Sequence, residues 1–163
     1  MKQGTMSRTE GLWLLVFVVS TFGAAALGSA FTSTSVNTWY AQLHKPAFNP
    51  PNWVFGPVWS TLYLLMAVSA WLVWRNGGWT GGRVALTLFI IQLALNVLWS
   101  ALFFGLRQPG FAMIDIVLLL SAIIGTTVAF MPVSKLAFWL MGPYVLWVSF
   151  ASVLNFKIWQ LNR

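Results

Sequence analysis

Five long apolar runs dominate this chain of 163 residues. A helix needs about 20 apolar residues to cross the hydrocarbon core of a bilayer, and each run is about that long. The runs cover approximately residues 11–31, 53–74, 84–105, 110–130 and 136–158. The sequence therefore predicts an all-α integral membrane protein with one domain over residues 1–163, a bundle of five transmembrane helices.

The composition excludes the other broad classes of protein. Hydrophobic residues make up 59% of the chain and charged residues 7%, whereas a soluble domain carries about 25% charged residues. The net charge is +7, but the Lys and Arg residues are scattered singly between the apolar runs. Such a pattern lacks the basic cluster that nucleic-acid binding requires. These cations divide almost evenly between the two sides of the bundle, so neither its orientation nor the membrane that holds it, inner or outer, is predicted.

The breaks between the runs predict how the helices are connected. Three of the four breaks are short, so neighbouring helices are expected to run antiparallel in an up-down bundle. The glycine-containing segments 75–78 and 81–82 are expected to end helices. Pro109 is expected at a helix boundary, whereas Pro143 lies inside the fifth run and is expected to kink it.

The first run allows two interpretations. Lys2 and Arg8 precede it, and it ends in the small residues of segment 27–30. That pattern also describes a secretory signal peptide. The apolar region of a signal peptide has about 7–15 residues, so the greater length of this run favours a retained helix.

The first break, residues 32–52, is too long and too aromatic for a passive connection. It contains Trp39, Tyr40 and Phe48 together with three prolines, which stiffen it. Loops of this length in a compact domain are commonly lids or binding loops. We expect an ordered loop that caps one mouth of the bundle and includes a short helix at 39–43. The alternative is an aromatic anchor at the level of the lipid headgroups.

Eight of the eleven tryptophans fall into two groups. Those near the ends of runs fit an interfacial belt of amphipathic rings: Trp13, Trp71, Trp74, Trp79 and Trp159. Trp59, Trp99 and Trp147 lie well inside runs, where hydrocarbon offers no acceptor for an indole N–H. These three side chains are therefore expected to face the bundle interior.

Helical spacing places aromatic and amide side chains on one face of three runs. The faces are Phe55, Trp59, Tyr63 and Met66 in the second run, Gln92, Asn96, Trp99 and Phe103 in the third, and Pro143, Trp147, Ala151, Leu154 and Ile158 in the fifth. Ala151 follows Trp147 by one turn and leaves space beside its ring. Such faces could enclose an aromatic-walled cavity with few polar groups, the usual character of a small-molecule site. The alternative is a close-packed core without a cavity.

Asp115 is the only acidic residue inside a run, about one and a half turns into the fourth. A carboxylate at that depth is expensive to bury without a partner. Arg107 is the nearest candidate partner in the sequence, and we interpret the two as an ion pair between the third and fourth helices. The alternative is a functional carboxylate. Small residues such as Gly28 and Gly105 predict close helix contact, either within the chain or at a homodimer seam.

The chain has few residues that could act as acid–base catalysts or as metal ligands. A single histidine, His44, and two separated acids can form neither a metal site with several protein ligands nor a Ser-His-Asp triad. No glycine-rich phosphate loop is present. The sequence therefore predicts no metal, no required cofactor and no acid–base catalytic residues.

From Trp39 to Trp159 the chain resembles the TspO/translocator protein family, also called tryptophan-rich sensory proteins or peripheral-type benzodiazepine receptors. Short termini and Phe111, where Trp is common, favour a bacterial member. The resemblance rests on ordered segments: Trp39-Tyr40, Leu43-x-Lys45-Pro46, Pro50-Pro51-x-Trp53-Val54-Phe55-Gly56-Pro57-Val58-Trp59, Leu62-Tyr63-x-x-Met66, Gln92-Leu93-Ala94-Leu95-Asn96-x-x-Trp99, Phe103-Phe104-Gly105-x-Arg107-Gln108, Asp115 and Pro143-Tyr144-x-x-Trp147-x-x-Phe150-Ala151-x-x-Leu154-Asn155.

The resemblance implies a pocket inside the bundle, capped by the first loop, that binds porphyrins such as protoporphyrin IX and other hydrophobic aromatic or sterol-like ligands. The ligand-binding residues expected from spacing and resemblance together are Tyr40, Trp59, Tyr63, Asn96, Trp99, Trp147, Ala151 and Leu154. The resemblance also implies a homodimer, with the third helix as a seam. Phe156-Lys157 stands where the sterol motif of eukaryotic members needs Tyr and a basic residue.

Three functions follow as expectations. The leading one is a receptor or transporter-like sensor of porphyrins that affects tetrapyrrole or stress regulation. The first alternative is light-dependent porphyrin degradation, an enzyme-like activity for which the resemblance implicates Trp59 and Trp147. The second alternative is a membrane scaffold whose protein partners matter more than any ligand.

Overall fold

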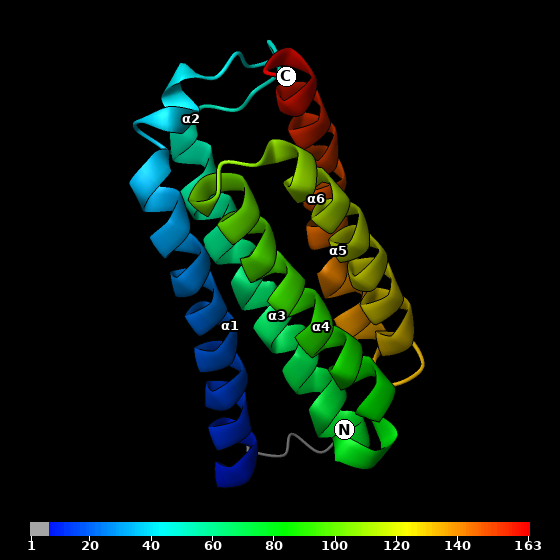
Figure 1. Ribbon diagram of the computed structural model, residues 1–163. Helices are drawn as coiled ribbons and strands as arrows, with labels where there is room; N and C mark the ends of the chain where they lie inside the picture. The colour runs from blue at the N-terminus through cyan, green and yellow to red at the C-terminus, as the bar shows by residue number, and fades with distance from the viewer. Residues whose placement is uncertain (1–6) are drawn as a thin grey trace.

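The computed structural model describes residues 7–163, and all its regular elements are helices (Figure 1). In chain order they are α1 (Arg8–Ser35), α2 (Trp39–Gln42), α3 (Asn52–Gly81), α4 (Arg83–Ser100), the π-helical turn η1 (Ala101–Gly105), α5 (Pro109–Phe130) and α6 (Lys135–Leu161). Within this part of the chain five helices, with η1 continuing α4, are long and apolar enough to cross a membrane. The predicted all-α membrane fold is confirmed.

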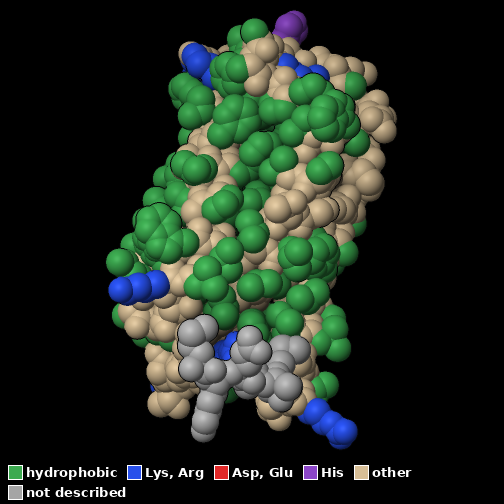
Figure 2. Space-filling view, turned by 180° about the vertical axis from the view of Figure 1, so that it is seen from behind, with side chains coloured by type: hydrophobic (Ala, Val, Ile, Leu, Met, Phe, Trp, Pro, Cys, Tyr) green, Lys and Arg blue, Asp and Glu red, His purple; other side chains and the backbone are tan. Residues whose placement is uncertain are grey.

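The five long helices form a ring that differs from their order in the sequence. α1 packs against α3 and α4, α3 against α6, α6 against α5, and α5 against α4. Successive helices alternate in direction, as the short connections predict (Figure 1). Figure 2 shows a face on which hydrophobic side chains cover the middle and Lys and Arg side chains lie toward the ends. That distribution suits a molecule embedded in a bilayer.

Two of the expected run ends are wrong. α1 continues to Ser35, so the first connection is shorter than 32–52 and includes the short helix α2 close to its expected place. α3 continues beyond the expected end at residue 74 and ends at Gly81, in the second of the two glycine segments expected to end helices. In the first of these segments, the positive φ of 59° at Gly78 interrupts the helical backbone and kinks α3, and Trp79 beyond the kink packs on Trp13 with ring centroids 5.4 Å apart. Pro109 opens α5 as expected, and Pro143 lies inside α6.

The N-terminal end of α1 is fixed to α3 by Glu10. Ser7 and Glu10 form a capping box that satisfies the first backbone N–H groups of the helix. The Glu10 carboxylate pairs with the Arg75 guanidinium at 2.7 Å, and its backbone carbonyl accepts from the Trp71 indole at 3.0 Å. α1 is thus an integral part of the bundle, as a retained helix would be. Lys2, on which the signal-peptide interpretation also rests, lies outside the described residues.

The small residues expected at a close helix contact serve packing within the chain. A Cβ added at Gly28 would lie 3.1 Å from the Ser100 hydroxyl, and one at Gly105 would lie 2.9 Å from the Phe31 ring. α1 therefore approaches α4 and η1 too closely for larger residues at these positions. The homodimer stays a prediction.

A chain of buried hydrogen bonds joins α3, α4 and α6 at mid-height. The Tyr63 hydroxyl donates to Asn96 Oδ1 at 2.5 Å, and the Asn96 amide donates to the Tyr144 hydroxyl at 3.0 Å. Tyr144 in turn donates to Gln92 Oε1 at 3.0 Å, and the Gln92 amide contacts Met66 Sδ at 3.8 Å. All five side chains are buried. Each of these bonds connects two helices, so the chain fixes how far apart they lie.

The expected ion pair between Asp115 and Arg107 is wrong. Asp115 is buried on α5, and neither carboxylate oxygen has a hydrogen-bond partner in the structure. Arg107 is exposed in the turn before α5, where its φ of 57° marks a sharp reversal of the chain. The one ion pair among residues 7–163 is that of Glu10 with Arg75, near the opposite end of the bundle.

We predict that Tyr144→Phe destabilises the bundle by about 1–3 kcal/mol, because it leaves the Asn96 amide and the Gln92 carbonyl without their partner. The measurement is reversible unfolding in mixed micelles. Adding Gln92→Leu to Tyr144→Phe should cost less than the sum of the two single changes, since both remove one shared bond. Strictly additive costs would contradict the coupling.

Candidate functional site

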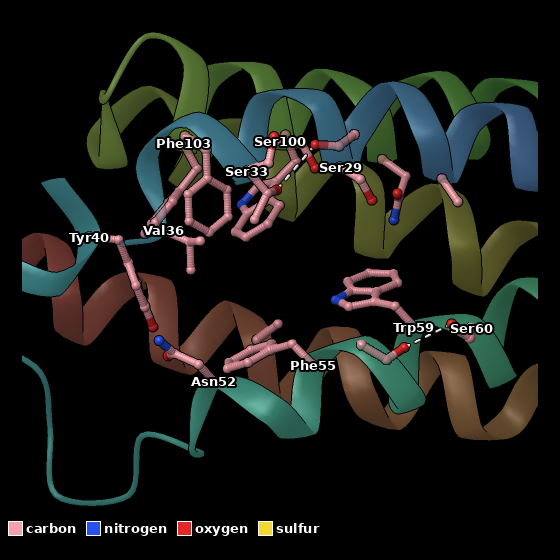
Figure 3. A pocket seen from close by; sticks show the side chains of 18 of the residues that line it. Ser29, Ser33, Val36, Tyr40, Asn52, Phe55, Trp59, Ser60, Ser100 and Phe103 are labelled. Atoms are coloured by element: carbon pink, nitrogen blue, oxygen red, sulfur yellow. Dashed lines mark hydrogen bonds between the residues drawn. The ribbon is translucent and has the colours of Figure 1, made fainter. Parts of the chain in front are cut away.

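A cavity of about 660 Å³ lies in the half of the bundle nearest α2. Its walls come from α1, α3, α4, η1 and α6, and α2 closes one end (Figure 3). α5 contributes no lining residue and packs behind α4 and α6. Small-molecule sites have volumes of about 300–1,000 Å³, so this cavity suits a ligand of substantial size. The close-packed alternative is therefore wrong for this half.

All eight side chains expected to bind a ligand line this one cavity: Tyr40, Trp59, Tyr63, Asn96, Trp99, Trp147, Ala151 and Leu154. They come from four different elements, α2, α3, α4 and α6. Trp59 and Phe55 project from α3 into the cavity opposite residues of α1 (Figure 3). The tryptophans at mid-bilayer depth thus face the interior, as predicted.

The walls are built from aromatic rings that support one another. The ring of Trp147 lies 5.9 Å from that of Phe55, across the α3–α6 boundary. Trp99 stacks on Phe103 with centroids 5.1 Å apart and an interplanar angle of 24°. Such offset and edge contacts stabilise each ring in one orientation. The cavity therefore presents fixed flat surfaces.

The three interior tryptophans differ in their hydrogen bonds. The Trp99 indole donates to Asn155 Oδ1 at 2.9 Å, and the Asn155 amide donates to the Pro109 carbonyl at 2.9 Å. The indole nitrogens of Trp59 and Trp147 have no hydrogen-bond acceptor among residues 7–163, but neither nitrogen is fully buried. The nitrogen of Trp59 is drawn turned into the cavity (Figure 3). Trp99 is thus a structural element, whereas the indole N–H of Trp59 is available to a ligand.

Tyr63 and Asn96 form one end of the cavity, which we call the floor. The floor is polar, but the hydrogen-bonding groups of these two side chains are already paired within the protein. Both side chains belong to the buried chain of hydrogen bonds that continues to Tyr144. The Trp59 ring covers this floor, with its centroid 5.7 Å from Tyr63 and 6.2 Å from Tyr144. A ligand here meets aromatic surface rather than unpaired polar groups.

The opposite end is closed by the cap, which we define as α2 and residues 43–51. Tyr40 is only 4% exposed, and its hydroxyl donates to Asn49 Oδ1 at 2.9 Å. Its ring packs against Phe103 and Phe104, and Lys45 Nζ lies 4.7 Å from the ring centroid. Burial raises the pKa of the Tyr40 phenol, so the hydroxyl stays protonated at neutral pH and keeps its bond. The ordered loop is confirmed.

Asn162 attaches the cap to the end of α6. The backbone N–H of His44 donates to Asn162 Oδ1, and the Asn162 amide donates back to the His44 carbonyl, both at 2.9 Å. The same amide also donates to the Ile158 carbonyl at 2.7 Å. The role of Asn162 was not predicted from the sequence. Nothing in the local sequence around a polar residue near a chain end indicates that it bonds to a residue 118 positions away.

The contribution of α1 to the cavity was also not predicted from the sequence. Ala26, Ser29 and Ser33 line it, and Ser29 and Ser33 are seen on α1 in Figure 3. Their spacing of three and four residues places them on one helical face. A face of small residues gives no sequence signal of a cavity, because it fits a close helix contact equally well.

The end that carries the cap is positively charged. Lys45 lies in the cap, Arg107 in the turn before α5, and Lys157 and Arg163 at the end of α6. Within residues 7–163 the only acids are Glu10, near the opposite end, and the buried Asp115. The carboxylates of an amphiphilic ligand would therefore be attracted to this end.

Comparison with known proteins gives one consistent result. The sequence model of the TspO/MBR family matches residues 15–160. The chain is 46% identical over 151 residues to the tryptophan-rich protein TspO of Archaeoglobus fulgidus, which covers 93% of this chain and 97% of the relative. It is 46% identical over 139 residues to the translocator protein of Homo sapiens, covering 84% and 82% respectively. A tryptophan-rich sensory protein of Cereibacter sphaeroides is 35% identical over 141 residues, covering 85% and 87%.

We predict that Asn162→Ala loosens the cap. The change removes both bonds to His44, so hydrogen exchange of the His44 amide should accelerate by roughly tenfold. The matched control is Gln160→Ala, which removes another exposed amide from the same helix end but leaves the cap untouched. Equal exchange rates at His44 in both variants would show that Asn162 does not hold the cap.

Proposed function

The chain belongs to the TspO/MBR family, and from that premise we propose that it is a membrane sensor for flat, hydrophobic, aromatic ligands, with protoporphyrin IX as the first candidate. The ligand would lie in the capped cavity between α1, α3, α4 and α6. Occupancy of the cavity would depend on the concentration of tetrapyrrole in the membrane, so binding would make the protein a sensor of that concentration. This agrees with the name of one relative, a tryptophan-rich sensory protein. No metal and no further cofactor is required by this proposal.

The observation that carries the proposal is the convergence on one cavity of the eight side chains expected from spacing and resemblance together. Periodicity selects faces on separate helices, and the fold brings those faces together around about 660 Å³ of space. A porphyrin macrocycle is flat, aromatic and largely apolar. Its faces would stack against rings such as Trp59 and Trp147, and Ala151 leaves room beside the latter.

The polar groups of a porphyrin would find partners at the capped end. Its propionate carboxylates would be attracted to cations such as Lys45, and charge-assisted bonds are the stronger kind. The indole N–H of Trp59 offers a further donor from the wall. A scaffold, by contrast, has no need for an interior cavity of this kind, so the geometry favours the ligand-binding function.

Sterol binding through the end of α6 is not part of the proposal. Phe156 occupies the position where the motif needs a phenol, and it lies exposed on the lipid-facing side. Lys157 lies 6.0 Å over the Phe156 ring. The position therefore offers no hydroxyl for a sterol, and motifs of this kind carry little weight in any case.

We predict that Trp147→Ala weakens protoporphyrin IX binding by roughly tenfold or more, equivalent to about 1.4 kcal/mol. The change removes one flat wall of the cavity. The measurement is quenching of intrinsic tryptophan fluorescence in lipid nanodiscs, titrated with the porphyrin.

The matched control is Trp139→Ala. Trp139 lies on the same helix but is 72% exposed and does not line the cavity. It should leave the affinity unchanged while altering the fluorescence signal by a comparable amount. If Trp139→Ala and Trp147→Ala bind equally well, the porphyrin does not occupy this cavity.

A second candidate function is light-driven porphyrin degradation. The supporting observation is that Trp59 lines the cavity and lies within 6.2 Å of two tyrosine rings, Tyr63 and Tyr144. An indole beside an excited porphyrin can donate an electron to it, and the reduced porphyrin would pass that electron to dioxygen, which gives superoxide. The oxidised indole, whose charge the neighbouring tyrosines could share, would then take an electron from the macrocycle, and the macrocycle cation would combine with superoxide, so that porphyrin and dioxygen give an oxygenated porphyrin and the indole is restored.

We predict that, if this activity exists, Trp59→Phe and Trp147→Phe slow porphyrin bleaching under illumination while a dark sample stays unchanged. Absorbance of the bound porphyrin provides the measurement. Phe keeps the flat ring but loses the easily oxidised indole, so binding and photochemistry are separated. Bleaching no faster than that of free porphyrin would remove this second function.

A further inference from the structure

α1 changes its packing partner halfway along its length. Near its N-terminal end it is fixed to α3, where the Trp71 indole donates to the Glu10 carbonyl at 3.0 Å. Near its C-terminal end it is fixed to η1, where the Ser35 hydroxyl donates to the Phe104 carbonyl at 2.7 Å. Gly28 faces α4 in the same half. α1 therefore leaves α3 as it approaches the capped end.

A slit opens between α1 and α3 in that half. Phe22 and Tyr63 form a ring contact between the two helices at 6.3 Å, beyond which small side chains face each other. The rim residues, defined as residues of α1 and α3 beyond Phe22 that both line the cavity and are exposed, are Ala26, Ser29, Ser33, Asn52, Gly56 and Ser60. A Cβ added at Gly56 would meet no atom within 4 Å, which shows open space there.

The other end of the cavity is closed. Tyr40 is 4% exposed and bonded to Asn49, and Asn162 holds the cap to α6 through two bonds to His44. The rim residues, in contrast, lie on two membrane-spanning helices and are exposed. The cavity is thus covered by the cap at one end and open between α1 and α3.

We propose that this slit is a lateral opening through which the cavity exchanges its ligand with the bilayer. The ligand class is a flat, hydrophobic molecule dissolved in the membrane, so the inference rests on the proposed function. The rim suits such passage because the Ser33 and Ser60 hydroxyls donate to carbonyls of their own helices, at 3.1 and 2.9 Å. An apolar ligand that slides past them breaks no hydrogen bond with water.

The test is Gly56→Leu against Gly23→Leu. Both glycines are exposed in helices, and a Cβ at either meets nothing within 4 Å, but only Gly56 lines the cavity. The measurement is stopped-flow quenching of tryptophan fluorescence by protoporphyrin IX in lipid nanodiscs. Gly56→Leu should lower the association and dissociation rates together, by about tenfold, because Gly56 lies at the rim of the cavity and a leucine there narrows the path. Gly23→Leu should change neither rate.

Two results would overturn the lateral opening. Equal rates in the two variants would show that no ligand passes Gly56. Faster dissociation alone in Gly56→Leu would make Gly56 a contact of the bound ligand. Ala26→Leu, on the opposite rim, should slow exchange in the same way, and serves if Gly56→Leu fails to fold. Asn162→Ala, which frees the cap, should leave the rates unchanged, and faster exchange in it would assign the route to the capped end.

A readout without ligand separates this inference from the proposed function. The chain has no cysteine, so Gly56→Cys and Gly23→Cys each carry a single thiol for a fluorophore. Spin-labelled lipid should quench both fluorophores equally, because both positions face the bilayer. Protection at Gly56 alone, by a second copy or by closure of the helices, would overturn the opening even if porphyrin binds. Absence of porphyrin binding in the unaltered chain would refute the proposed function instead, and equal quenching would still support the opening.

Discussion

The buried chain of hydrogen bonds from Tyr63 through Asn96 and Tyr144 to Gln92 is the interaction on which the rest of the structure depends. Inside a bilayer no water can replace a lost partner, so each of these polar groups must find its partner within the bundle. The bonds fix α3, α4 and α6 at one separation. On one side of them the helices pack closely around residues such as Met66, and on the other side the same separation leaves the cavity open.

Polar groups in the half of the bundle nearest the cap are also paired within the protein. Two side-chain amides there each bond to two partners: Asn155 joins the Trp99 indole to the start of α5, and Asn162 joins the cap to α6. With these groups satisfied, the walls hold their positions without a ligand. The indole N–H groups of Trp59 and Trp147 have no acceptor among residues 7–163. A cavity whose walls are held by paired structural groups, and that keeps unpaired donors such as Trp59, is prepared for a ligand before that ligand arrives.

α1 has a different role from the other helices. Its hydrogen bonds to other helices lie at its two ends, Glu10 with Trp71 and Ser35 with Phe104, and they attach it to different neighbours. Beyond Phe22, which contacts Tyr63, its face toward α3 carries small side chains that fill little space. The helix therefore completes the ring while leaving one side of the cavity open to the membrane. Asp115 takes no part in this arrangement, since it lies buried on α5 without a partner and away from the cavity lining.

Hydrophobic length and helical period are local properties, so the spanning helices, the aromatic faces of α3, α4 and α6, and the ordered cap could be predicted from the sequence. Spacing and the family resemblance together also placed Tyr40 and Trp147, which belong to separate elements, in one site. Three features came from the tertiary structure alone: α1 contacts α3 near one end and η1 near the other, Asn162 bonds to His44, and Arg107 forms no ion pair with Asp115. These contacts join residues far apart along the chain, up to 118 positions, and depend on which helix lies beside which. Periodicity records the faces of one helix and contains no information about the neighbour that covers them.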